Sequence, residues 1–149
     1  MKSLYDHYAS AFKNLGVRVL VESPSSDGGL VYSIEYKGVR GVEVGVNASK
    51  FRAVTLRCPI TFQDIEPSVR AVLLEKINQA NAERFGVKYY VLPDFDAVTR
   101  SLGRLSPVVV AVEAVLARTE DIELLFDTYF SMLVMALRAL HTIAKTVTT

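Results

Sequence analysis

The feature that most constrains the fold is a stretch near the C-terminus, residues 122–144, that would be apolar on almost every side of a helix. Its apolar residues recur at steps of four and three, which predicts a long helix with one continuous apolar stripe. Phe130, Val134 and Leu137 add a second apolar face. A helix at the edge of a monomeric domain needs only one such face. This helix therefore either lies at the centre of the domain or presents its second face to a partner.

We favour the second explanation, because a chain of 149 residues has few elements with which to cover both faces. The sequence thus predicts a homodimer, or binding of an unidentified protein or peptide, through the second face. The alternative, burial of this face within the monomer, stays open. The candidate interface residues are Phe130, Val134, Leu137 and His141.

Charges limit the compartments and partners that we expect. Glu123, Asp127 and Arg138 interrupt the apolar stretch, so its uncharged run is shorter than the roughly 20 residues of a membrane span. The N-terminus lacks the apolar core of a signal peptide, and the single cysteine cannot form an internal disulfide. We therefore expect a cytoplasmic protein.

The 17 basic and 16 acidic residues leave a formal charge of +1, so a nucleic-acid partner is not expected.

The rest of the chain predicts one α+β domain over residues 1–149, with an antiparallel sheet packed by helices. Helical and alternating apolar spacings follow one another in the order α-ββββ-α-ββ-α-α. Ser3 is placed to cap the first helix and Gly16 to end it. The predicted helices span residues 3–15, 67–85, 108–118 and 119–145, and the predicted strands span 17–22, 30–36, 41–46, 51–58, 87–92 and 97–105.

No catalytic, cofactor-binding or metal-ligating group is predicted. Cys58 would need a neighbouring base to act as a nucleophile, and the two histidines lie near the chain ends, so a buried structural thiol is the simpler interpretation. Two histidines without a Cys-x-x-Cys or His-x-x-x-His pair do not make a zinc site. Asp94 and Asp96 lie in a predicted turn, where aspartate is common for backbone reasons.

Two further patterns have both a functional and a structural interpretation. Basic residues near aromatic ones in the third and fourth strands resemble a single-stranded nucleic-acid surface, but Tyr32 and Tyr36 alternate with apolar residues as in a core-facing row. Asn78 and Asn81 share one face of the second helix, where they either bond to a neighbouring loop or have no role. The basic residues are Lys37, Arg40, Lys50, Arg52 and Arg57, with Phe51 as a further aromatic.

From about residue 65 onward the chain resembles the YbjN domain family. The resemblance lies in the helix ending Ile77-Asn78-Gln79-Ala80-Asn81, in Phe85-Gly86 and the hairpin after it, and in Ser106-Pro107 before an acidic start at Thr119-Glu120-Asp121. The upstream helix and strands follow the same layout. The sequence departs from the family in having no tryptophan.

The resemblance implies a fold like that of type III secretion chaperones and a role as a regulator of sensory transduction. It implies no reaction and no cofactor, and a structural role for Asn78 and Asn81. The function expected is therefore non-enzymatic protein binding, chaperone-like or regulatory, as a homodimer. The alternatives are a small-molecule sensor, RNA binding through a basic sheet face, and an enzyme that uses Asp94, Asp96 or Glu43.

Overall fold

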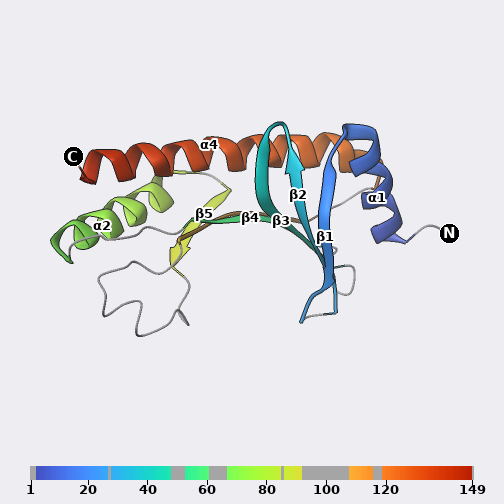
Figure 1. Ribbon diagram of the computed structural model, residues 1–149, viewed down its shortest axis with the longest axis horizontal. Helices are drawn as coiled ribbons and strands as arrows, with labels where there is room; N and C mark the ends of the chain where they lie inside the picture. The colour runs from blue at the N-terminus through green and yellow to red at the C-terminus, as the bar shows by residue number, and fades with distance from the viewer. Residues whose placement is uncertain are drawn as a thin grey trace. The chain divides into compact units, whose positions relative to one another are not determined.

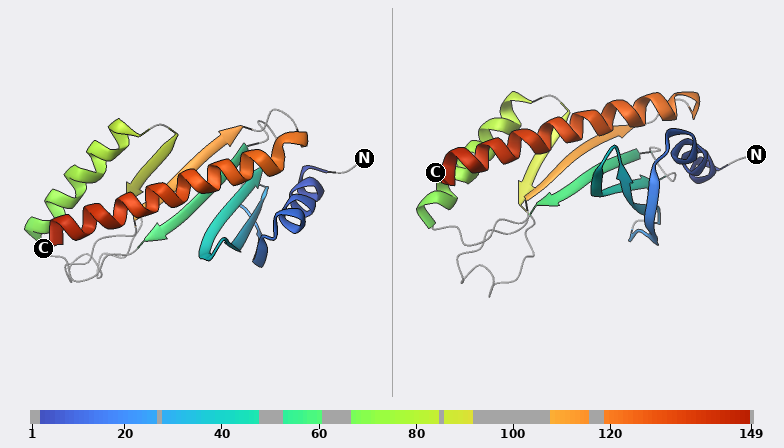
Figure 2. Two further views of the ribbon diagram at one scale, coloured as in Figure 1. Left: turned by 90° about the horizontal axis from the view of Figure 1, so that it is seen from above. Right: turned by 45° about the horizontal axis from the view of Figure 1, so that its top comes forward.

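The computed structural model describes residues 3–26, 28–47, 53–60, 67–84, 86–91, 108–115 and 119–148. Figures 1 and 2 show the elements that these residues form. Their order, with a short 3₁₀ helix in the penultimate place, is the predicted one and confirms the α+β class. The elements are α1 (Leu4–Leu15), β1 (Arg18–Pro24), β2 (Leu30–Tyr36), β3 (Val39–Asn47), β4 (Ala53–Ile60), α2 (Pro67–Glu83), β5 (Val87–Val91), β6 (Val108–Val115), η1 (Thr119–Asp121) and α4 (Ile122–Thr148).

The strands form one antiparallel sheet in the order β1-β2-β3-β4-β6-β5. Consecutive hairpins join the first four strands, as the alternating pattern predicts. Figure 2 shows the arrows of β4, β6 and β5 pointing in alternating directions. β1 and β5 are therefore the edge strands of the sheet.

The chain forms two compact units, each built from two segments that are distant in sequence. The first unit comprises Met1–Cys58 and Val112–Ser131, and the second comprises Pro59–Ala111 and Met132–Thr149. The first turns of α4 thus belong to one unit and its later turns to the other. The single domain over residues 1–149 stays a prediction.

The first unit begins with a helix whose two ends agree with the sequence. The Ser3 hydroxyl accepts a hydrogen bond from the Asp6 N–H at 3.2 Å, and the Asp6 carboxylate accepts one from the Ser3 N–H at 3.1 Å. This capping box satisfies two donors that would otherwise lack partners. Gly16 ends the helix at φ 78°, a left-handed conformation that glycine adopts without steric cost.

An aromatic cluster forms the core of this unit. Ring centroids lie 5.2 Å apart for Phe12 and Phe126 and 4.9 Å apart for Tyr36 and Phe130, both with steeply tilted rings. Such edge-to-face pairs add about 0.5–1.5 kcal/mol each beyond the burial of apolar area. The six members, all buried, are Tyr8, Phe12, Tyr32, Tyr36, Phe126 and Phe130.

A polar contact joins the β2–β3 hairpin to α4 beside this cluster. Lys37 at φ 48° and Gly38 at φ 77° make the tight turn between these two strands. Asp127 Oδ1 accepts hydrogen bonds from the Tyr36 hydroxyl and from Lys37 Nζ, each at 2.7 Å. The carboxylate thus holds the hairpin against the helix.

Strand β1 departs from the expected alternation. Val17, Val19 and Val21 were expected on one face of a strand, but the β1–β2 register shifts between Val19 and Val21. A bulge of this kind disturbs the two-residue period. Val19 and Val21 are accordingly exposed, whereas Val17, just before the strand, is buried.

The predicted helix over residues 108–118 is wrong, because Val108–Val115 form strand β6. Each residue from Val108 to Val112 is at most 2% exposed. A short, continuous run of β-branched residues that is buried on both faces is typical of an interior strand, and this environment outweighs the helix preference of Glu113 and Ala114. The predicted strand over residues 97–105 lies outside the described residues.

Candidate binding site

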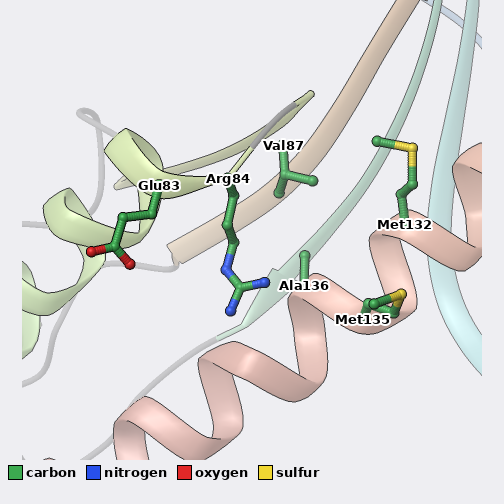
Figure 3. Close-up of a pocket in the computed structure, with 6 residues that line it drawn as sticks. All are labelled: Glu83, Arg84, Val87, Met132, Met135 and Ala136. Carbon is green, nitrogen blue, oxygen red and sulfur yellow. The ribbon is translucent and has the colours of Figure 1, made fainter.

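A surface hollow in the second unit is the candidate site. It has a volume of about 280 Å³, and its six lining residues come from the end of α2, the start of β5 and the later turns of α4. Figure 3 shows these residues on the three elements, with the Arg84 side chain extending toward Ala136. We call it the methionine hollow; it is lined by Glu83, Arg84, Val87, Met132, Met135 and Ala136.

A glycine turns the chain between two of the elements that line the methionine hollow. α2 ends at Glu83, and Gly86 turns the chain into β5 with φ 72°. A Cβ atom at this position would lie 2.9 Å from Met132 Cε. The backbone conformation therefore favours glycine here, whereas the Met132 methyl group, at the end of a flexible side chain, could move aside.

Asn81 fixes β5 beside the hollow. Its side-chain amide donates to the Tyr89 carbonyl at 2.7 Å, and its side-chain oxygen accepts from the Tyr89 N–H at 2.6 Å. The Tyr89 hydroxyl in turn donates to the Ala136 carbonyl on α4 at 3.0 Å. Asn81 thus bonds to another segment, but that segment is strand β5 and not the expected loop, whereas Asn78 is exposed.

The lining combines an adaptable apolar wall with one cation. Met135 is 65% exposed, and Met132 is half-buried. Methionine is unbranched and polarisable, so it adapts its shape to different apolar partners. Arg84 supplies the positive charge, and the carboxylate of Glu83 accepts a hydrogen bond from Gln79 Nε2 at 3.1 Å. The arrangement suits binding of an apolar group next to an anion.

The four predicted interface residues do not form one open face. Phe130 is only 1% exposed and Leu137 only 8%. These two residues are therefore buried within the chain, which was the alternative to a partner interface. Val134 is half-buried and His141 is exposed. Homodimerisation itself stays a prediction.

The thiol of Cys58 is buried, as the structural interpretation predicted. Burial raises its pKa, and the nearby carboxylate of Glu43 raises it further, so the thiol is protonated near neutral pH and is a poor nucleophile. Glu43 also accepts a hydrogen bond from Arg57 Nε at 2.6 Å. Asp94 and Asp96 lie outside the described residues.

The structure gives little support to a nucleic-acid surface on the sheet. Tyr32 and Tyr36 are buried in the aromatic cluster, which confirms the core-facing row and removes them as stacking platforms. Lys37 and Arg57 are held in ion pairs with Asp127 and Glu43. Phe51, Lys50 and Arg52 lie outside the described residues.

Two searches for other site types gave negative results within the part of the chain that the structure describes. No three histidine, cysteine or carboxylate side chains there gather into a group that could hold a metal ion. None of the described helices is long and apolar enough to cross a membrane.

Met132 and Met135 fall within the predicted helix over residues 119–145, but neither they nor Arg84 were predicted to line a site. One signal was present: two of the three methionines in the chain stand three positions apart, which puts them on the same face of a helix. The position of Arg84 depends on where the end of α2 lies relative to α4. The spacing of residues along the chain does not predict this arrangement.

No family model matches this chain, and no curated protein matches it either. The resemblance to the YbjN family therefore stays a prediction.

Proposed function

We propose that this chain is a non-enzymatic protein-binding domain that accepts an apolar side chain of a partner polypeptide in the methionine hollow. The observation that carries the proposal is the 65% exposure of Met135 at the rim of a preformed apolar hollow. An exposed, flexible thioether beside a hollow is a common feature of surfaces that bind varied apolar partners.

The size and frame of the hollow support a side chain as the occupant. Its volume of about 280 Å³ is at the small end of small-molecule pockets, which span about 300–1,000 Å³. The bonds from Asn81 to Tyr89 and from Tyr89 to Ala136 hold its framework, so binding needs only the methionine side chains to move. Little conformational entropy is then lost on binding.

Methionine methyl groups offer a direct test. The protein, labelled with ¹³C at its methionine methyl groups, would be titrated with end-blocked peptides that carry leucine or phenylalanine in a Gly-Ser background. We expect the signals of Met132 and Met135 to shift while the signal of Met1 stays in place as an internal control. A serine-only peptide should shift none of them.

Matched variants of α4 then locate the binding. Met135→Ser should weaken peptide binding, whereas Leu124→Ser should not, because Leu124 is 69% exposed on the same helix but does not line the hollow. If no apolar peptide moves the Met132 and Met135 signals, or if Met135→Ser leaves the affinity unchanged, the proposal is wrong.

Homodimerisation is a separate proposal with its own measurement. Size-exclusion chromatography with light scattering, over a range of concentrations, gives the mass in solution. A monomer at every concentration would contradict the homodimer and leave the peptide-binding proposal intact.

A further inference from the structure

The methionine hollow has a cation at its rim that is not neutralised within the described part of the chain. Arg84 is exposed. The ion pairs there join Lys37 to Asp127 and Arg57 to Glu43, and neither includes Arg84. Arg84 thus leaves a positive charge beside an apolar wall.

The other charged residue of the lining, Glu83, forms no ion pair with Arg84 within the residues that the structure describes. Glu83 is engaged by Gln79, one turn earlier on α2. Figure 3 shows the Glu83 carboxylate directed away from Met132, while the Arg84 side chain extends toward Ala136. Burial raises the pKa of Tyr89 and the positive charge of Arg84 lowers it, which fits a guanidinium close to the Tyr89–Ala136 contact.

We propose that Arg84 selects the partner by binding the carboxylate of an aspartate or glutamate that neighbours the inserted apolar side chain. This inference rests on the proposed function, since it names the chemistry of the polypeptide that the hollow accepts. Arginine presents paired N–H donors that match the two oxygens of a carboxylate. The apolar wall formed by Val87, Met132 and Ala136 lowers the local dielectric, which strengthens such a pair.

The test compares two end-blocked peptides that are identical except at one side chain. One contains Leu-Asp and the other contains Leu-Asn, so a charged carboxylate is replaced by a neutral amide. Both affinities are measured on the full chain, from the changes that each peptide causes in the NMR signals of the methionine methyl groups. We expect the Leu-Asp peptide to bind about tenfold more tightly, the effect of one charge-assisted hydrogen bond of roughly 1.4 kcal/mol. Higher salt should reduce this preference.

Two arginine variants separate a specific contact from general attraction. Arg84→Gln should remove the preference for Leu-Asp over Leu-Asn, so that the ratio of the two affinities falls to about one. Arg138→Gln removes an exposed arginine of α4 outside the hollow lining and should keep the preference.

Each contrary outcome has its own meaning. Equal binding of both peptides, or a preference that survives Arg84→Gln, would overturn the role of Arg84 and leave the proposed function standing. Failure of both peptides would overturn the proposed function. Arg84-dependent binding of octanoate, without binding of either peptide, would assign the hollow to a small carboxylic acid instead.

Discussion

The first and the later turns of α4 show two different ways to use an apolar helix. In the first unit, Phe126 and Phe130 are buried among aromatic rings from α1 and β2, with no more than 3% of either side chain exposed. In the second unit, Met132 and Met135 line an open hollow. The contrast teaches that one apolar helix carries both a closed aromatic core segment and an open apolar surface.

The residue types explain the contrast physically. Aromatic rings have few rotamers and pack in defined edge-to-face geometries, which favours a single closed arrangement. Methionine has three rotatable bonds and tolerates partial exposure. We therefore expect substitutions in the aromatic cluster to change stability, and substitutions in the methionine hollow to change binding.

The largest effect is expected from Phe130→Ala. Removing this buried ring, which is 1% exposed, leaves a cavity next to Tyr36 and should cost about 3–5 kcal/mol in the free energy of unfolding. Urea unfolding followed by circular dichroism measures the change. The matched variant Leu124→Ala removes an exposed side chain of the same helix and should cost less than about 0.5 kcal/mol. Similar losses in both variants would break the comparison.

A smaller but substantial loss is expected from Asn81→Ala. The variant leaves the Tyr89 N–H and carbonyl without their side-chain partners, which should cost about 1–3 kcal/mol. Asn78→Ala is the control, because Asn78 is exposed on the same helix. The prediction fails if the two variants unfold at the same urea concentration.

A pH-dependent effect is expected from Asp127→Asn. The hydrogen bond from Lys37, followed by that from Tyr36, lowers the pKa of Asp127 in the folded state. Its contribution to stability is thus complete above its unfolded-state pKa of about 4 and is lost as the pH falls through the lower folded value.

The melting temperature of Asp127→Asn should therefore lie below that of the parent protein at neutral pH and approach it in acid. Because Lys37 and Asp127 are exposed, the difference should be small. Glu75→Gln removes an exposed carboxylate of α2 and leaves the Asp127 contact in place, so it is the control. A constant difference at every pH would contradict the assignment.

The smallest effect on stability is expected from Met135→Ser. With 65% of its surface already exposed, Met135 should contribute less than about 0.5 kcal/mol to the free energy of unfolding. Urea unfolding checks this, and a loss comparable to that of Phe130→Ala would mean that Met135 belongs to the core.

Local signals predicted much of the fold. The cap at Ser3, the stop at Gly16 and the strand Leu30–Tyr36 all follow from chemistry within a few residues, and each agrees with the structure. β6 could not be recognised in this way, because a run of valines with nearby helix-forming residues suits either a buried strand or a buried helix. Its burial on both faces, which only the assembled sheet supplies, decides between them.

The candidate site was less accessible to sequence reasoning. The second apolar face of the last helix was identified, but burial of Phe130 and Leu137 depends on what packs against the helix. The role of Asn81 was partly foreseen, since an asparagine within a helix needs a reason to be there. The identity of its partner could not be predicted, because Tyr89 meets Asn81 only after the chain has turned back at Gly86.

The contact between Asn81 and Tyr89 has a consequence for how a partner can approach. β5 is an edge strand, and an exposed edge ordinarily invites another extended chain to pair with it. Here the amide of Asn81 already occupies the donor and the acceptor of Tyr89. Another extended chain therefore finds the backbone donor and acceptor of Tyr89 already engaged, so the same contact hinders edge-to-edge pairing at this residue.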